Sequence, residues 1–268
     1  MFHHICIIGL GEVGFPTADY ILKKNLNVSG YDISSKAVKN AKDNQVQSYL
    51  DFSEIPTDID VFIVCVNTGL TADNEADMSA VWSVCELIKK RKPKLVSIES
   101  TLIPGTSRAI YNQLLSTQIS LVHVPHRFWP SNPQQYGVNQ NRVIGAIDTT
   151  SMELGYSFYS TQLGIPLTKT ETIEAAEMTK ITENAYRYVS IAFAEEIYLI
   201  CNELGINFED VRNAANSKWN TQIMEPRNGI GGPCLPKDTQ YVRNLVDTEY
   251  LIQGAMKTDQ RFRDYSSK

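Results

Sequence analysis

The 268-residue sequence has few of the features that mark membrane, secreted or metal-binding proteins. No apolar stretch reaches the ~18 residues needed to cross a bilayer, so we expect no transmembrane helix. The N-terminus runs directly into a strand pattern, with no signal-peptide layout. The five cysteines are an odd number at no metal-ligand spacing. We therefore expect reduced thiols, no bound metal and a cytoplasmic location.

An excess of basic charge is also missing. Lys and Arg number 25 against 30 Asp and Glu, and the formal net charge is −5. This balance weighs against nucleic acid or an anionic membrane as a partner. Internal repeats and low-complexity tracts are absent as well. With 43% hydrophobic residues, the chain can bury a substantial core in one large domain or two ordinary ones.

Apolar strand patterns alternate with helix patterns in the first part of the chain. The expected strands are residues 4–8, 27–31, 61–66, 94–98, 119–124 and 142–147. The expected helices are residues 11–24, 34–42 and 78–90, followed by one that opens at Pro104. The run 61–66 is entirely apolar, which indicates a central strand of a parallel sheet. The alternation predicts an α/β fold: a Rossmann-type parallel sheet with helices on both faces.

Helical patterns dominate after residue 148. The expected segments are helices over 149–163, 171–204 and 207–216, a glycine-rich loop over 226–236 and a final helical stretch to about residue 264. The segment 171–204 contains no Gly or Pro and is long for a globular helix, which indicates a central connecting helix. We therefore expect two domains: a Rossmann domain over 1–148 and an all-helical domain over 149–268.

The sequence Gly-Leu-Gly-Glu-Val-Gly over residues 9–14 lies between the first strand and the first helix, the context that a dinucleotide-binding loop requires. Asp32 ends the second strand, where a carboxylate accepts the ribose hydroxyls and repels a 2′-phosphate. The pattern therefore favours NAD over NADP. The expected cofactor contacts in this region are Gly9, Gly11, Glu12, Val13, Gly14, Asp32 and Lys36.

Two further strands end in polar turns at the edge of the sheet where ligands of α/β proteins bind. Val66 ends the third strand and Thr68 follows it, and Thr101 follows the fourth. We expect Val66, Thr68 and Thr101 to contact the cofactor. The alternative for the first pair is a simple strand-ending turn. The alternative for Thr101 is capping of the helix that begins near Pro104, and the two roles are compatible.

Lys180 and Asn184 lie four residues apart in the long helix and share one face. A cation beside a neutral amide can stabilise an alkoxide or oxyanion. In isolation the pattern is more typical of a solvated helix face.

Cys234 follows three glycines in the segment Gly-Ile-Gly-Gly-Pro-Cys-Leu-Pro-Lys-Asp, and Asp238 lies four residues later at an expected helix start. A cysteine near a helix start can have a lowered pKa and act as a nucleophile. The alternative is a small buried apolar side chain. A Gly-Gly-Pro loop is an unusual place for a core cysteine, which favours the nucleophile.

Together these motifs resemble the UDP-glucose/GDP-mannose dehydrogenase family, from residue 4 to about residue 257. The resemblance is carried by GLGEVG, the acidic end of the second strand, VCVNT, ESTLIPGT, AEMTKITENAYRYVSIAFAEE and GIGGPCLPKD. It implies oxidation of the 6-hydroxyl of a nucleotide sugar to a carboxylate in two NAD-dependent steps. The expected substrate is a UDP-hexose or UDP-N-acetylhexosamine, in polysaccharide biosynthesis.

The resemblance also implies roles for individual residues. Cys234 is expected to form a thiohemiacetal and then a thioester. Lys180 and Asn184 are expected to stabilise the oxyanion, and Asp238 to assist proton transfer with Lys180. Thr101 is expected to position a water near the nicotinamide.

The chain departs from the family pattern at two places. His126, in the segment Pro-His-Arg-Phe-Trp-Pro, stands where the family has a catalytic Glu. Imidazole can also act as a general base, so His126 is a candidate catalytic residue; the alternative is a loop that has lost this role. The sequence also stops inside what resembles the helix leading to the family's C-terminal nucleotide-sugar-binding domain, so we expect that domain to be absent or supplied by a separate chain.

Two other functions stay open. A two-electron β-hydroxyacid-type dehydrogenase has a similar layout and a Lys-x-x-x-Asn pair, but does not need the cysteine loop. The second open function is that of a truncated paralogue that binds NAD but has little activity. The resemblance implies a homodimer through the long helix, and apolar residues on more than one side of residues 171–204 suit such a buried helix.

Overall fold

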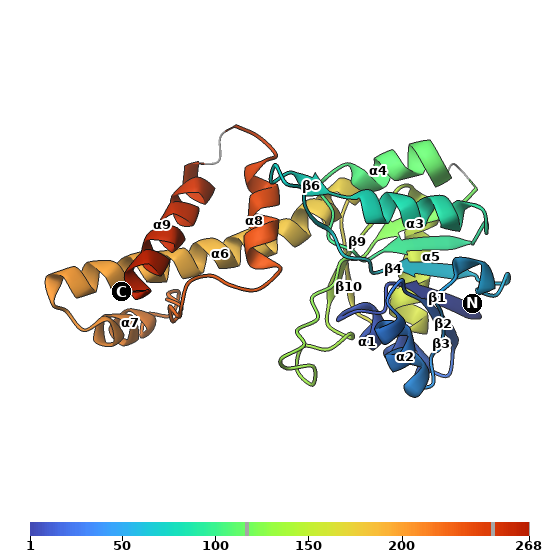
Figure 1. The fold of residues 1–268 in the computed structure, drawn as a ribbon, viewed down its shortest axis with the longest axis horizontal. Coiled ribbons are helices and arrows are strands. Elements are labelled where there is room, and N and C mark those ends of the chain that lie inside the picture. Colours follow the sequence, from blue (N-terminus) through green and yellow to red (C-terminus); the bar gives the residue numbers. More distant parts are fainter. Residues whose placement is uncertain (116–117, 248–249, 268) are drawn as a thin grey trace. The chain divides into compact units, whose positions relative to one another are not determined.

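The fold is described from a computed structural model, which places residues 1–115, 118–247 and 250–267 (Figure 1). Its main sheet has the strand order β10-β9-β8-β7-β4-β1-β2-β3. The strands are β1 (His4–Ile8), β2 (Asn27–Tyr31), β3 (Gln47–Tyr49), β4 (Val61–Val64), β7 (Leu95–Ile98), β8 (Ser120–His123), β9 (Arg142–Ala146) and β10 (Leu167–Lys169). The short strands β3 and β10 were not expected from the sequence.

The Rossmann-type sheet predicted from the sequence is confirmed, with one difference. Strands β3, β2, β1, β4, β7 and β8 run parallel, but β9 runs antiparallel to β8, with Val122 opposite Ala146. No helix connects β8 to β9, and an antiparallel neighbour does not need a crossover helix. The result is a mixed sheet rather than a fully parallel one.

The strand order places a topological switch point beside β1. The chain proceeds from β1 to β2 and β3 on one side, and then from β4 to β7 and β8 on the other. The loops that follow β1 and β4 therefore lie side by side at the carboxyl edge of the sheet, the position where ligands of open α/β sheets bind. Both loops belong to motifs singled out from the sequence.

Helices cover both faces of this sheet, as expected. They are α1 (Gly14–Leu22), α2 (Ser35–Asp43), α3 (Ser79–Lys89), α4 (Thr106–Ile110) and α5 (Thr149–Tyr156). Figure 1 shows α3 and α4 on one face and α1, α2 and α5 on the other. Central strand residues such as Ile5, Ile7, Val61 and Ile63 are completely buried in the main core. This apolar burial is the main force that holds the sheet and its helices together.

The chain divides into two compact units. The first comprises residues 1–69 and 76–180, and the second residues 70–75 and 181–268. The first unit extends past the expected boundary at residue 148, because α5 packs on β8 and β9 and because β10 pairs with β9. The tip of a small hairpin, formed by β5 (Gly69–Leu70) and β6 (Ala76–Asp77), is part of the second unit.

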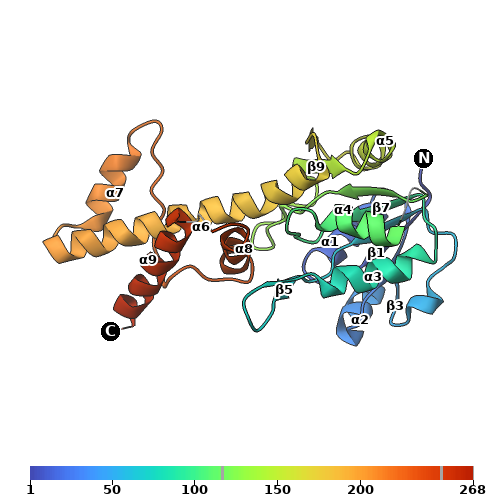
Figure 2. The same ribbon diagram turned by 90° about the horizontal axis from the view of Figure 1, so that it is seen from above.

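Helices α6 (Ile173–Leu204), α7 (Phe208–Asn216), α8 (Leu235–Arg243) and α9 (Tyr250–Ser266) follow (Figure 2). The long helix agrees with the expected 171–204 segment. The final helical stretch, expected as one segment, is two helices. Asn244 is the C-cap residue of α8, and its side chain donates to the Asn74 carbonyl at 2.8 Å. Tyr198 of α6 contacts the rings of Phe208 in α7 and Phe262 in α9.

Within the ranges that the structure describes, no helix is long and apolar enough to cross a membrane.

Candidate functional site

The glycine loop packs tightly against the end of β4 on one side and is open on the other. Gly9 has φ +91°, and a Cβ there would lie 2.5 Å from the Cys65 carbonyl oxygen. A Cβ on Gly14 would lie 1.7 Å from the Gly9 carbonyl oxygen. A Cβ on Gly11 would have no atom within 4 Å. Close packing thus requires glycine at positions 9 and 14. At Gly11 the backbone is not covered, so a phosphate could approach it.

Asp32 links the glycine loop to the end of β2. Its Oδ2 accepts a hydrogen bond from the Leu10 amide at 2.7 Å, and its Oδ1 accepts one from the Ser34 amide at 2.7 Å. The carboxylate is therefore held beside the loop, and its remaining lone pairs can accept hydroxyl groups. Lys36 lies nearby in the first turn of α2 and is exposed.

The loops after β4 and β7 are joined by side-chain hydrogen bonds. Thr68 Oγ1 donates to the Thr101 carbonyl at 2.9 Å, and Ser100 Oγ donates to the Val66 carbonyl at 2.7 Å. The structure thus brings together Val66, Thr68 and Thr101, which the sequence had named separately.

Capping of α4 by Thr101 is wrong. The helix begins at Thr106 after Gly105, and no side chain of its N-cap residue binds it. Instead, the carboxylate of Glu177 in α6 accepts hydrogen bonds from the Gly105 amide at 2.6 Å and the Ser107 amide at 2.7 Å. Glu177 is completely buried, and it satisfies the helix start from 70 residues away in sequence. Such a long-range cap has no local sequence signal.

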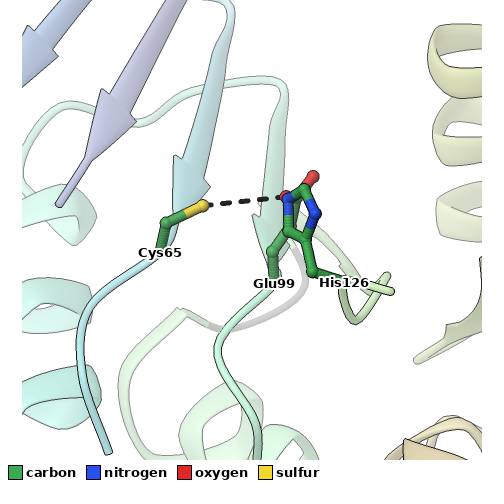
Figure 3. Close-up of side chains that lie close together, drawn as sticks. All are labelled: Cys65, Glu99 and His126. Atoms are coloured by element: carbon green, nitrogen blue, oxygen red, sulfur yellow. Dashed lines mark hydrogen bonds and ion pairs between the residues drawn. The ribbon is translucent and has the colours of Figure 1, made fainter. Parts of the chain in front are cut away.

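A buried polar cluster lies at the ends of β4, β7 and β8, centred on Glu99 (Figure 3). One carboxylate oxygen, Oε1, is 3.0 Å from Arg142 Nη1 and accepts a hydrogen bond from the Tyr159 hydroxyl at 2.5 Å. The other, Oε2, pairs with Nε2 of His126, and the Cys65 thiol donates to it at 3.7 Å. Each partner comes from a different segment of the first unit.

These contacts decide which groups of the cluster carry charge. Burial opposes ionisation of Glu99, but His126, the Arg142 guanidinium and the hydrogen bonds outweigh it and lower the pKa of this carboxyl to about 2. Burial, together with the charges of Arg142 and Lys180, lowers the pKa of His126 to about 4. At neutral pH the cluster therefore holds an ionised Glu99, a charged Arg142 and a neutral imidazole.

The structure places the side chain of His126 inside this buried cluster. Its side chain is only 6% exposed, and it lies against Glu99 and Thr17 rather than on a loop surface. Sequence reasoning missed Glu99, Arg142 and Tyr159. Glu99 begins the ESTLIPGT segment directly after β7, and this position at a strand end was the signal available for it.

Cys65, Glu99 and His126 are also of the residue types that bind metals, and their ligand atoms lie within 4.8 Å of one another. The surroundings do not favour a cation. Burial and the Glu99 charge raise the pKa of the Cys65 thiol well above its usual value, and the Arg142 guanidinium already neutralises the carboxylate. A divalent ion would bring more positive charge beside a buried guanidinium.

Lys180 and Asn184 occupy successive turns of α6, as expected. Lys180 belongs to the first unit, where its positive charge contributes to the lowered pKa of His126. Asn184 belongs to the second unit and donates through Nδ2 to Asp238 Oδ2 at 2.5 Å. The helix thus carries each residue into a different polar neighbourhood.

The cysteine loop ends at the start of α8. Cys234 is the residue that precedes this helix, and it is exposed. Asp238, one turn later, is only 1% exposed and lies 2.7 Å from Lys237 Nζ as well as against Asn184. Lys237 was not named from the sequence, although it lies within the same motif. The first turn of α8 thus carries an exposed thiol at its N-cap and a buried, hydrogen-bonded carboxylate.

Helix α9 holds the glycine-rich part of this loop. Asp259 Oδ1 accepts a hydrogen bond from the Ile230 amide at 2.8 Å, and Oδ2 accepts one from the Tyr188 hydroxyl at 2.9 Å. Arg263 donates to the Ile230 carbonyl, and a Cβ on Gly229 would lie 2.6 Å from the Arg263 side chain. Asp259 and Arg263 also form an ion pair with each other. The loop backbone at Ile230 is therefore held by hydrogen bonds to both members of this pair.

Comparisons with known proteins all point to one enzyme family. Residues 46–163 match the model of the UDP-glucose/GDP-mannose dehydrogenase family, NAD binding domain, and residues 174–261 match the model of the same family's central domain. A UDP-N-acetyl-D-mannosamine dehydrogenase of Methanocaldococcus jannaschii is 34% identical over 94% of this chain and 64% of its own length. One from Methanococcus maripaludis is 30% identical over 97% of this chain and 66% of its own length. The chain thus spans about two thirds of these relatives.

Solved structures of similar fold include members of the same group of dehydrogenases. A UDP-D-ManNAc dehydrogenase from Pyrococcus horikoshii superposes with a TM-score of 0.90 at 27% identity, covering 98% of this chain and 70% of that chain. A 3-hydroxyisobutyrate dehydrogenase from Mycobacterium tuberculosis superposes with a TM-score of 0.77 at 15% identity, which shows a shared fold alone.

Proposed function

The chain belongs to the UDP-glucose/GDP-mannose dehydrogenase family, and from this premise we propose that it takes part in the NAD-dependent oxidation of a nucleotide sugar. The substrate class is a UDP-N-acetylhexosamine, because the similar curated proteins include UDP-N-acetyl-D-mannosamine dehydrogenases. The reaction converts the 6-hydroxyl to a carboxylate. The observation that carries the proposal is Cys234, an exposed thiol at the start of α8, followed one turn later by the buried Asp238.

The NAD-binding domain has the features that the cofactor requires. The open face at Gly11 and the N-terminus of α1 would hold the pyrophosphate, and Asp32 would accept the ribose hydroxyls. Thr68 and Thr101 lie at the same edge of the sheet. When bound, NAD⁺ would accept a hydride in each of the two oxidation steps.

The residues of the cysteine motif supply the covalent chemistry. The Cys234 thiolate adds to the aldehyde carbon formed in the first oxidation, which gives a thiohemiacetal. The second oxidation gives a thioester, and water then cleaves the carbon–sulfur bond to release the carboxylate and the thiol. In this proposal Lys180 and Asn184 stabilise the oxyanion, Asp238 assists proton transfer, Thr101 positions the water, and His126 serves as a base.

The test is to incubate the chain with NAD⁺ and a panel of UDP-hexoses and UDP-N-acetylhexosamines, and to measure NADH absorbance. We expect two NADH per sugar oxidised, and loss of turnover in Cys234→Ala. Cys201→Ala is the matched control, because Cys201 is a buried thiol of α6 that the mechanism does not use. Wild-type turnover in Cys234→Ala would overturn covalent catalysis. One NADH per substrate would favour a two-electron dehydrogenase, and NAD binding without turnover would favour a non-catalytic paralogue.

We also propose a homodimer formed through α6. The helix exposes a line of large apolar side chains at Tyr186, Phe193, Ile200 and Leu204. The first three are seven residues apart and therefore lie on one face, the spacing typical of a helix that packs against another.

A further inference from the structure

The contacts of His126 determine which of its ring nitrogens carries the proton. Nε2 faces two oxygens: Oε2 of Glu99, with which it pairs, and Oγ1 of Thr17 at 3.1 Å. The Thr17 hydroxyl donates its own hydrogen to the Val13 carbonyl at 3.0 Å, so its oxygen is available as an acceptor. Glu99 is ionised and can only accept. Both neighbours therefore require a proton on Nε2.

The other nitrogen has no such neighbour. Nδ1 of His126 is buried and has no hydrogen-bond partner among the described residues. In a neutral imidazole with Nε2 protonated, Nδ1 carries a lone pair and acts only as an acceptor. A buried acceptor without a partner is costly to maintain, which points to a group that binds there in the working protein.

We infer that Glu99 is a positioning residue that holds His126 as the Nε2–H tautomer, which leaves Nδ1 as the atom that accepts a proton or hydrogen bond from the substrate. The logic is that of a carboxylate that orients an imidazole base. Glu99 is itself fixed by Arg142 and Tyr159, so its orientation does not depend on the imidazole. The substrate part of the inference rests on the proposed function, but the tautomer does not.

Arg142 has a second consequence for the pair. Its guanidinium contacts Oε1 of Glu99 while the imidazole pairs with Oε2, and its charge lowers the pKa of both the carboxyl and the imidazole. The position where the family has a carboxylate therefore offers a neutral acceptor in this chain.

The tautomer is tested by long-range ¹H–¹⁵N spectra of the full chain labelled with ¹⁵N-histidine at pH 7, with His126 assigned by the signal lost in His126→Gln. We expect a neutral ring with the proton on Nε2. In Glu99→Gln the side-chain amide can donate to Nε2, and we expect the proton to move to Nδ1. Cys65→Ser keeps the carboxylate and is the matched control, expected to keep the wild-type pattern.

A wild-type ring protonated on Nδ1, or a Glu99→Gln variant with the wild-type tautomer, would overturn the inference. If Glu99→Gln does not fold, Glu99→Asp serves instead, with the Nε2–H tautomer expected to be less populated. Zn²⁺ added alone distinguishes the metal alternative. Stoichiometric binding that shifts the His126 signals and is lost in Cys65→Ser would show a metal site and overturn the assignment.

The catalytic part is tested by the pH profile of turnover. We expect Glu99→Gln to lower kcat by about 10- to 100-fold and to change its acid limb, with NAD affinity unchanged. A fall in kcat with an unaltered profile would indicate a structural role only. Absence of turnover in the wild-type chain would contradict the proposed function while the tautomer measurement still stands.

Discussion

The side-chain amide of Asn184 donates a hydrogen bond of 2.5 Å to the carboxylate of Asp238, 54 residues later in the sequence. Asp238 is only 1% exposed, and this amide and Lys237 are polar partners of its carboxylate. The two residues that the family resemblance assigned to separate tasks are thus one hydrogen-bonded unit. Changes at either position should affect the stability of the second unit as well as its chemistry.

Asn184→Asp tests this relationship. The substitution would place a second carboxylate in contact with the buried carboxylate of Asp238, and ionising both would be unfavourable. We expect a loss of about 3 kcal/mol in the free energy of unfolding at pH 7, and a smaller loss at pH 5, where one carboxyl takes up a proton. Urea denaturation at the two pH values measures it. Asn184→Ala is the control, with a loss of about 1–2 kcal/mol that does not depend on pH.

Two substitutions in the glycine loop should have different effects, one on packing and the other on cofactor binding. Gly14→Ala forces a Cβ against the Gly9 carbonyl, so we expect a loss of about 3 kcal/mol or more in the free energy of unfolding. Gly11→Ala places its Cβ in open space, so the melting temperature should stay unchanged while NAD affinity falls at least about tenfold. Equal melting temperatures for the two variants would contradict the packing argument.

Asp32→Asn removes the charge that disfavours a 2′-phosphate while it keeps the size of the side chain. We expect the preference for NAD over NADP, measured by isothermal titration of each cofactor, to fall by about tenfold or more. Asp51→Asn is the matched control, because Asp51 also accepts a backbone hydrogen bond, from Ser53, in an exposed turn. An unchanged preference in Asp32→Asn would contradict the assignment.

The buried imidazole makes the first unit sensitive to acid. The pKa of His126 is about 4 in the folded chain, below the value of 6.5 for an ordinary histidine. Between these values the unfolded chain binds more protons at this residue, so the contribution of His126 to stability falls as the pH drops from 6.5 to 4, by about 3 kcal/mol at most. His126→Gln, whose amide can still donate to Glu99, should lessen this fall in thermal melts. His3→Gln, at an exposed histidine, should leave it unchanged.

The exposed line on α6 predicts a change of oligomeric state. Phe193→Asp should shift the chain from dimer to monomer in sedimentation velocity at tens of micromolar. Trp219→Asp, which alters an exposed aromatic residue beyond α7, should stay dimeric. A wild-type chain that sediments only as a monomer would rule the dimer out.

The sequence by itself determined the order of the main strands and helices, the glycine loop with Asp32, and the cysteine motif, because these depend on local periodicity and on residues close together in the chain. It also predicted Lys180 and Asn184 on one helix. The antiparallel β9, the extra strands β3 and β10 and the break between α8 and α9 were not predicted, because pairing partners and side-chain caps come from distant segments.

Only the tertiary structure decided what surrounds each chemical group. From the sequence, His126 was a candidate base at the position where the family has a Glu. In the fold it lies buried between Thr17, from the first helix, and Glu99, from the end of β7. The charge of Glu99 in turn depends on Arg142 of β9. Burial and partners set the protonation of a histidine, and both arise only when segments more than 25 residues apart are folded against one another.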